Sequence, residues 1–246
     1  MNTREQILEA AWELYSDRGF EDVSVRDVTQ AAGVNLASVS YHFGGIDGLI
    51  QETLRRCLNQ INLYRMELLN REVDNKGGLE KLPMRAVFGA FLRPLAIPEE
   101  CAVPSALILR SVARYLIQPD YAIPKASREL YAETLGLFAK ALRLHFPERS
   151  TGAMIKHLVF LSGAMTYDRG LGGLAMELSG QKSGEHQIDE GGHGHRQGEM
   201  DHGENGGNDP HLNEREQSLS DVIEFAIYGF GGNTQGSEDV PFTTEI

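Results

Sequence analysis

A short polar segment near the N-terminus carries side chains that could read a nucleic acid. The outward positions expected over residues 35–41 are small or hydroxyl-bearing: Asn35, Ala37, Ser38, Ser40 and Tyr41. Amides and hydroxyls of this kind bond base edges or phosphates, and an alanine methyl can contact the methyl of thymine. A short polar helix can equally be a solvated connector, so these residue types alone leave both interpretations open.

Capping residues and glycines divide the chain around this segment into helices. Apolar residues recur at helical spacing, which predicts three helices over residues 3–18, 25–32 and 36–42. Ser24 and Asn35 are good N-caps for the second and third helices, and Gly33 breaks the chain between them. Two helices joined by a tight turn, the second short and polar, form a helix-turn-helix. In such units the second helix enters the major groove of DNA.

Residues 7–49 resemble the DNA-binding domain of the tetracycline-repressor (TetR) family of bacterial transcription factors. The matching motifs are an apolar helix ending in "RGF", then "SVRDV", "AAGV" at the turn, and "YHFG" followed by "DGL". The resemblance implies that the third helix docks in the major groove. It assigns Asn35, Ala37, Ser38 and Ser40 to base edges, Tyr41 and His42 to phosphates, and Ser24 and Arg26 to the flanking backbone. The alternative interpretation of His42 is a structural role.

The start of the fourth predicted helix, 46–70, departs from the family pattern. Ile46 stands where most relatives have a lysine. The missing charge predicts lower affinity and a salt dependence flatter by about one counterion. Residues 1–65 carry 6 Lys and Arg against 9 Asp and Glu, a net charge of −3. The cations expected to contact DNA are therefore few, and binding would need to be dimeric to be tight: Arg4, Arg26, Arg55 and Arg56.

Helical periodicity continues through most of the chain, and no alternating strand pattern of useful length occurs. Further helices are predicted at 79–94, 104–117, 122–145, 150–178 and 219–230, with a linker at 74–78. The predicted fold class is all-α. Residues 1–46 form the helix-turn-helix DNA-binding domain and residues 47–230 a helical bundle for effector binding and dimerisation. A disordered Gly/His/acid-rich insertion is expected at 181–218 and a flexible tail at 231–246.

The resemblance also implies that the bundle holds a small, largely apolar effector whose binding releases the protein from its operator. The candidate residues are Phe88, Phe91, Arg110, Arg114, Tyr115, Tyr131 and Phe138. The aromatic residues are otherwise ordinary core. Arginines on apolar helices are unusual because an unpaired buried charge is costly, although they could reach solvent or pair with acids. A loose similarity of residues 104–142 to a fatty-acid-responsive subgroup makes a fatty acid or acyl thioester the expected effector.

Family members dimerise through their last two long helices, which here predicts a homodimer on a palindromic operator. The residues expected to carry that interface are Leu158, Leu161, Met165, Val222, Phe225, Ala226 and Tyr228. Two such protomers would place their recognition helices in successive major grooves, about 34–36 Å apart.

Other chemistry has little support in the sequence. The histidines of the predicted insertion fit a solvated loop, with weak metal binding as the alternative: His186, His193, His195, His202 and His211. No catalytic spacing or cofactor motif occurs, so neither an enzyme nor a cofactor is expected. No apolar run approaches the ~20 residues that span a bilayer. Two cysteines make no disulfide framework, which favours the cytoplasm.

The uneven charge of the chain is compatible with DNA binding. The net charge is −12, but residues 181–246 carry 3 Lys and Arg against 14 Asp and Glu. Bulk charge governs solubility and not what one face binds. The sequence therefore predicts a ligand-responsive, sequence-specific transcriptional regulator, with repression as the expected direction. The alternative is a helical carrier of an apolar or metal ligand that does not bind DNA, in which Ile46 reflects a lost operator function.

Overall fold

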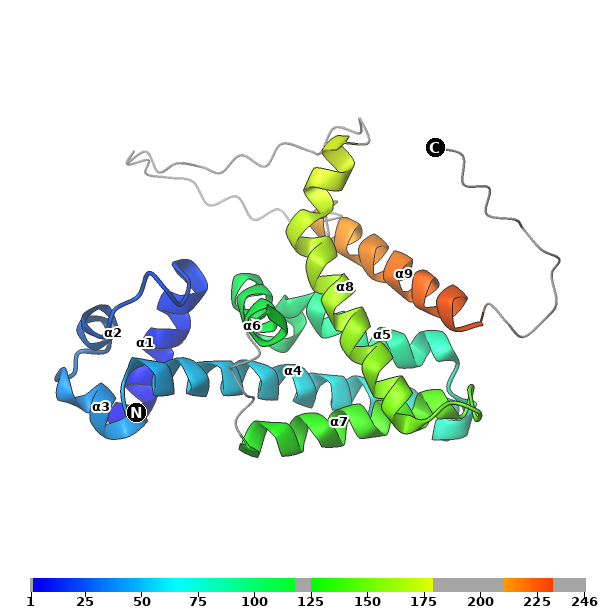
Figure 1. The fold of residues 1–246 in the computed structure, drawn as a ribbon, viewed down its shortest axis with the longest axis horizontal. Coiled ribbons are helices and arrows are strands. Elements are labelled where there is room, and N and C mark those ends of the chain that lie inside the picture. The colour runs from blue at the N-terminus through cyan, green and yellow to red at the C-terminus, as the bar shows by residue number, and fades with distance from the viewer. Residues whose placement is uncertain (1, 118–124, 179–209, 232–246) are drawn as a thin grey trace, which may run out of the picture.

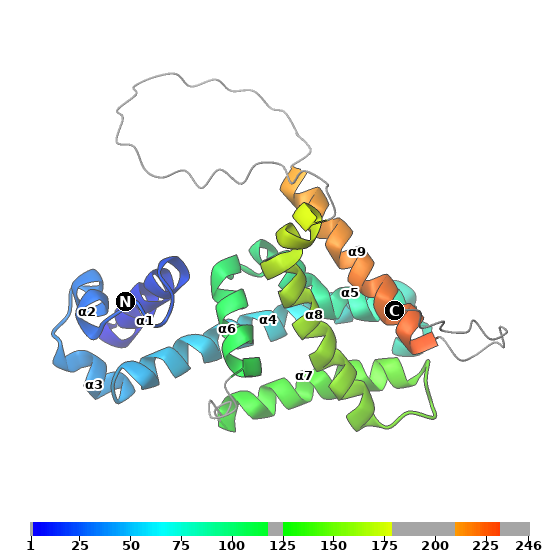
Figure 2. The same cartoon turned by 45° about the horizontal axis from the view of Figure 1, so that its top comes forward.

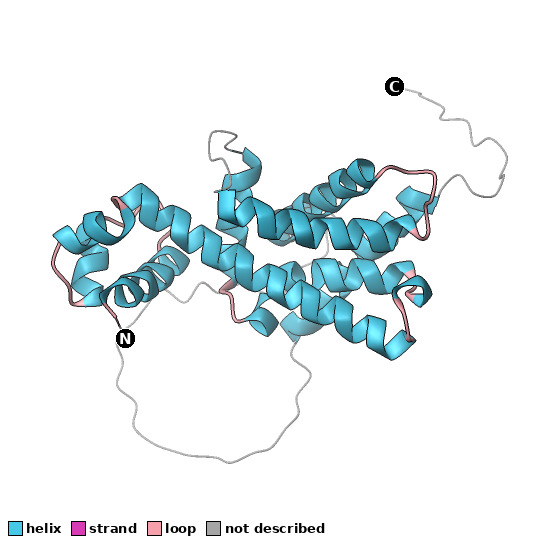
Figure 3. Cartoon of the chain, turned by 90° about the horizontal axis from the view of Figure 1, so that it is seen from below, coloured by secondary structure: helices cyan, strands magenta, loops and turns pink. Residues whose placement is uncertain are grey.

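The computed structural model describes residues 2–117, 125–178 and 210–231, and every regular element in these ranges is a helix (Figures 1 and 3). The α-helices are α1 (Thr3–Asp17), α2 (Val25–Ala32), α3 (Ala37–Phe43), α4 (Ile46–Lys76), α5 (Met84–Ala96), α6 (Ser105–Ile117), α7 (Lys125–Arg143), α8 (Thr151–Leu178) and α9 (Pro210–Gly231). Two short 3-10 helices, η1 (Leu79–Lys81) and η2 (Pro98–Cys101), flank α5. The predicted all-α fold class is confirmed.

The three N-terminal helices pack against the beginning of α4 and form a small domain at one end of the molecule (Figure 1). Their shared core is apolar and fully buried: Ile7, Ala11, Tyr15, Val28, Val39 and Leu49. Local signals set the helix ends. The Asn2 side chain accepts a hydrogen bond from the Glu5 N–H (2.9 Å), and Gly33 ends α2 in the left-handed conformation (φ 65°).

Gly48 lets the first turn of α4 approach the end of α3. A Cβ atom at this position would overlap the carbonyl oxygen of Phe43, so no other residue fits without a backbone shift. This close contact restrains the angle between α3 and α4, the helix that leaves the domain.

Helix α4 runs unbroken from the N-terminal domain along the bundle (Figure 1). It extends to Lys76 and ends at Gly77, which adopts the left-handed conformation (φ 73°). The predicted linker at 74–78 is therefore wrong for its first three residues, because nothing before Gly77 breaks the helix. Helix α5 begins at Met84, later than predicted, because Pro83 holds Leu82 in an extended conformation.

The C-terminal helices form a bundle around a core that runs through α4, α5, α7 and α8. Helix α5 packs against α4, α8 and α9, and α7 packs against α4 and α8 (Figure 2). Helix α6 lies between the N-terminal domain and α8 and contacts both α1 and α8. The largest buried core side chains of the bundle are Phe88, Phe91, Phe138, Leu92 and Leu95.

Helix α9 begins at Pro210, nine residues before the predicted start. A proline suits the first turn of a helix, and two ion pairs hold the second turn to the bundle. Arg215 pairs with Glu99 (2.7 Å) and Glu216 with Arg93 (2.8 Å). Residues 210–218, predicted to belong to the disordered insertion, are thus helical. The remainder of that insertion and the predicted tail at 232–246 lie outside the described residues.

The described residues bear on two of the activities with little support in the sequence, membrane insertion and metal binding. No described helix is long and apolar enough to cross a membrane. The described part of the chain also contains no cluster of three or more potential metal-ligating side chains. The histidines of the predicted insertion lie outside the described side chains, so the metal alternative stays a prediction.

Candidate nucleic-acid interface

Helix α3 buries one face and presents the other to solvent. Val39 is fully buried, and Val34 and Phe43 pack against the same core. The predicted contact residues on α3 and just before it are exposed or half-buried: Asn35, Ala37, Ser40 and Tyr41 are exposed, and Ser38 and His42 are half-buried. Tyr41 has 85% of its surface exposed. The structure thus brings six predicted residues together on one helix face.

Asn35 caps α3 in the way that its residue type predicts. Its Oδ1 accepts a hydrogen bond from the Ala37 N–H (3.0 Å), and its carbonyl oxygen accepts one from the Ser38 N–H (2.9 Å). The helix starts at Ala37, one residue later than predicted. The capping bond engages Oδ1, so the amide NH2 group of Asn35 remains as a donor toward a base.

Ser24 has a structural role at the start of α2. The Asp27 N–H donates to its Oγ (3.2 Å), while the Ser24 N–H donates to Asp27 Oδ2 (2.8 Å), which completes a capping box. The hydrogen bonds from Ser24 hold the pKa of the Asp27 carboxyl below its usual range. Arg26, in the first turn of α2, is exposed and forms no ion pair with any described residue.

Three of the four predicted DNA-contacting cations are paired within the protein. Glu52 accepts hydrogen bonds from Arg4 (2.6 Å) and Arg55 (2.6 Å), and the Arg55 bond is the main reason that its pKa is lowered. Arg56 pairs with Glu9 (2.8 Å) and Glu5 (3.3 Å).

Sequence reasoning missed the pairs of Arg4 and Arg56 because their partners lie about fifty residues away, across α1 and α4. The Arg55–Glu52 pair is local, three residues apart on α4. Arg4 also lies over the ring of Phe43 (5.1 Å to its centroid), close to the end of α3. The N-terminal domain therefore offers few free cations to a phosphate backbone.

The predicted effector residues whose side chains are described do not gather in one polar site. Phe88, Phe91 and Phe138 are fully buried, and the rings of Phe91 and Phe138 meet edge to face (5.2 Å between centroids). These three are packed core, the alternative that residue type also allowed. Tyr131 is half-buried, whereas the side chains of Arg114 and Tyr115 lie outside the described residues.

Arg110, predicted to line the effector site, is bonded to the N-terminal domain. Its guanidinium donates to the carbonyl oxygens of Tyr15 (2.7 Å), Ser16 (2.6 Å) and Asp17 (3.4 Å). Those carbonyls belong to the last turn of α1. The side chain therefore points from α6 toward the N-terminal domain and away from the bundle interior.

Arg65 on α4 is the buried cation that sequence reasoning overlooked. It is 2% exposed, lies over the ring of Phe91 (3.9 Å to its centroid), and donates to the Phe91 carbonyl oxygen (2.8 Å) and to Asn62 Oδ1 (3.2 Å). Burial lowers the pKa of this guanidinium, which neighbouring Tyr131 partly opposes. No carboxylate among the described residues pairs with it. The sequence signal that could have revealed this buried cation is its position within an apolar stripe of α4.

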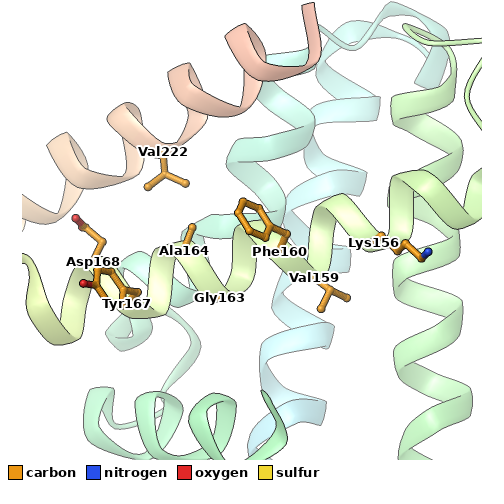
Figure 4. A pocket seen from close by; sticks show the side chains of 8 residues that line it. All are labelled: Lys156, Val159, Phe160, Gly163, Ala164, Tyr167, Asp168 and Val222. Carbon is orange, nitrogen blue, oxygen red and sulfur yellow. The ribbon is translucent and has the colours of Figure 1, made fainter. Parts of the chain in front are cut away.

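The surface formed by α8 and α9 carries large exposed apolar side chains. Phe225 and Tyr228 of α9 are 62% and 75% exposed, and Phe160 and Tyr167 of α8 are exposed to similar extents. An open groove on this surface is lined by Lys156, Val159, Phe160, Gly163, Ala164, Tyr167, Asp168 and Val222 (Figure 4).

Four of the predicted interface residues are buried within the protomer and cannot reach a partner: Leu158, Leu161, Met165 and Ala226. They form the inward face of α8 and α9.

Comparison with known proteins places both halves of the chain. The family model "Bacterial regulatory proteins, tetR family" matches residues 7–53, and "Tetracyclin repressor-like, C-terminal domain" matches residues 89–192. A solved structure, a putative TetR-family transcriptional regulator from Mesorhizobium loti, shares the fold with a TM-score of 0.50 at 15% identity. That alignment covers 92% of this chain and 96% of the other.

Two curated relatives match the chain over part of their length. The probable HTH-type transcriptional regulator YttP of Bacillus subtilis is 39% identical over 128 residues, which are 49% of this chain and 61% of that protein. The HTH-type transcriptional repressor KstR2 of Rhodococcus jostii is 30% identical over 79 residues, which are 32% of this chain and 39% of that protein. With family models on the helix-turn-helix and on the bundle, and with a shared fold, the chain belongs to the tetR family of bacterial regulatory proteins.

Proposed function

We propose that this chain is a sequence-specific DNA-binding transcriptional regulator that acts as a homodimer. The observation that carries the proposal is the exposed face of α3, with its amide, hydroxyl and methyl groups, held by buried Val39. A helix of this length and polarity fits the major groove, and its side chains match base edges in hydrogen-bonding capacity. Ser38 and Ser40 are assigned to bases, and Tyr41 and His42 to phosphates.

The dimer is supported by the apolar surface of α8 and α9. Large aromatic side chains exposed on the same two helices are unfavourable in water, and the groove beside Phe160 and Val222 can receive apolar side chains of a second copy. A two-fold axis through this surface relates the two protomers, so the dimer presents two recognition helices, one from each protomer. The operator is then a palindrome with half-sites about 34–36 Å apart, or a multiple of one helical turn.

A small effector that weakens operator binding is the regulatory part of the proposal. Such a molecule must bind the DNA-incompetent arrangement better than the competent one. Arg65 is buried against the apolar core of the bundle next to Tyr131, and it lacks a carboxylate partner among the described residues. A fatty acid or acyl thioester stays the expected effector. Repression fits the name of the Rhodococcus jostii relative, and the cytoplasm fits a protein that acts on chromosomal DNA.

Selection of bound genomic fragments with purified protein tests the proposal, followed by fluorescence anisotropy of the recovered fragment and of random DNA. A palindromic fragment bound far more tightly than random DNA supports the regulator. Ser38→Ala should change which sequence is preferred, whereas Tyr41→Ala should weaken binding to all sequences alike. Weak binding without sequence preference would instead favour the helical carrier, and apolar molecules extracted from the purified protein would then be identified.

A further inference from the structure

The last turn of α1 has no cation of its own, and the side chain of Arg18, the C-cap that follows it, pairs with Asp17 (3.5 Å). The final carbonyl groups of a helix have no partner within it and carry the negative end of the helix dipole. The N–H groups of Arg18 and Gly19 bond only the carbonyl oxygens of Leu14 and Tyr15, and α1 has no basic residue in its last turn. The end of α1 is thus an acceptor site that its own sequence does not complete.

Arg110 supplies that cation from α6, more than ninety residues further along the chain. One guanidinium nitrogen donates to Tyr15 and Ser16, and the other terminal nitrogen reaches Asp17. The guanidinium also lies against Gly19, at 3.5 Å from the position that a Cβ atom would take there. Charge-assisted bonds of this kind are short and among the stronger hydrogen bonds in proteins.

The residues beside Arg110 belong to the bundle core. Leu107, Ile108 and Ser111 are buried, so α6 is anchored against the bundle while Arg110 alone in this turn reaches α1 through described hydrogen bonds. Helix α6 stands between the two halves of the molecule (Figure 2). We propose that Arg110 is a positioning residue that fixes the orientation of the N-terminal domain relative to the bundle.

A guanidinium suits this task better than an ammonium group would. Its planar set of donors bonds several carbonyls at once and therefore restrains direction as well as distance. Helix α4 joins the two halves covalently, and the Arg110 bonds add a second attachment on the other side of α1. Two attachments restrict rotation of the N-terminal domain about α4, which one attachment alone would permit.

The orientation can be measured on a single chain. Spin labels at Asp22→Cys, in the loop between α1 and α2, and at Lys140→Cys, on α7, report the distance between the two halves; both positions are exposed. The label spares Cys57, because burial raises the pKa of its thiol to about 12, and half-buried Cys101 is replaced by serine. Labelled chains are diluted with unlabelled protein so that signals between protomers vanish.

Double electron–electron resonance should give one narrow distance distribution in the parent protein. Arg110→Met should broaden or shift it, Arg110→Lys should give an intermediate result, and Arg71→Met, which removes an exposed arginine of α4, should leave it unchanged. Far-UV circular dichroism at the same temperature must match the parent, which separates orientation from unfolding. An unchanged distribution in Arg110→Met overturns the proposal.

The effect on operator binding rests on the function proposed above, whereas the label distance does not. A freely oriented domain presents its recognition helix at many angles, so the ratio of operator to random-DNA affinity should fall about tenfold in Arg110→Met. Affinity for random DNA should stay nearly constant. A broadened distribution with no DNA binding by the parent protein would refute the proposed function and leave Arg110 as the positioning residue. A constant affinity ratio despite broadening would overturn its role in recognition.

Discussion

The exposed faces of α3 and of α8–α9 differ in what they offer a partner. The α3 face presents an amide, hydroxyls and one methyl group, while the α8–α9 face presents the aromatic rings of Phe160, Tyr167, Phe225 and Tyr228. Small polar groups stay hydrated in the free protein and can exchange water for the polar edges of bases. Burying clustered aromatic rings away from water lowers the free energy of the protein. One face is suited to a hydrated, charged partner, and the other to a second copy of an apolar surface.

The largest effect is expected from substitutions on α9, which test whether the α8–α9 face binds a second copy of the chain. Phe225→Glu combined with Tyr228→Glu should abolish the homodimer, because two carboxylates would have to be buried on each side of the interface. Loss of bivalent contact should weaken operator binding by about 100-fold or more. Sedimentation velocity reports the mass of the particle, and anisotropy reports the affinity.

Leu144→Glu is the matched control, since Leu144 is also half exposed but lies beyond the end of α7. A dimer that survives the double substitution, or that Leu144→Glu destroys, would contradict the assignment of the interface.

The positioning of α3 should depend on Gly48. Gly48→Ala places a methyl group against the Phe43 carbonyl and should destabilise the N-terminal domain by about 1–3 kcal/mol, while the dimer stays intact. Gly136→Ala provides the contrast, because Gly136 lies within α7 and a Cβ atom there meets nothing within 4 Å. That change should stabilise the protein by about 0.5–1 kcal/mol. Chemical denaturation, with operator binding measured in parallel, compares the stability of the two variants. Equal changes in stability would show that the α3–α4 junction tolerates a side chain at Gly48.

The ion pairs of Glu52 should limit the salt dependence of DNA binding. Glu52→Gln removes the carboxylate that holds Arg4 and Arg55, so both cations become available to phosphates. The slope of log affinity against log salt should steepen by up to about 1.8. Glu67→Gln, which frees only Arg71 further along α4, should leave the slope unchanged. An unchanged slope for Glu52→Gln would mean that these arginines lie away from the DNA.

The smallest expected effect is on the pH dependence of stability, through the ion pair between Arg93 of α5 and Glu100 of η2. Hydrogen bonds from Arg93 hold the pKa of the Glu100 carboxyl below its ordinary value of 4.5. The stabilisation from this pair is therefore present above pH 4.5 and lost as the pH falls through the lowered pKa. Because the pair is partly open to solvent, it contributes at most about 1 kcal/mol.

Glu100→Gln should flatten the acid side of the stability profile measured by urea unfolding. Glu148→Gln, at an exposed and longer ion pair, should not. A profile that stays equally steep in Glu100→Gln would show that other carboxylates govern acid unfolding.

The N-terminal domain could be predicted closely because its signals are local. Ser24, Gly33 and Asn35 act within three residues of the helix ends that they determine, and the structure places those ends within one residue of prediction. The start of α9 could not be predicted in this way. Its second turn is held by Arg93 and Glu99, which are more than a hundred residues away.

The distinction between local and distant signals also explains which features of the candidate sites could be predicted from the sequence. The exposed face of α3 follows from its polar residues, whereas Arg110 and Arg65 look alike in sequence as arginines on apolar helices. Their partners, the α1 carbonyls and the Phe91 carbonyl, become apparent only when the helices are packed. Helix α8 is apolar around much of its circumference, so periodicity could not tell Leu158, which faces inward, from Phe160, which faces solvent.

The unbroken course of α4 has a mechanical consequence. Its 31 residues at 1.5 Å each give a rod about 46 Å long, with no proline and no glycine after Gly48. Helices without such residues bend gently and do not kink, so a tilt imposed at one end is carried to the other. A tilt of about 5° would displace the far end by about 4 Å, roughly one base-pair step along DNA. A movement within the bundle smaller than a side chain is therefore enough to take a recognition helix out of register with its half-site.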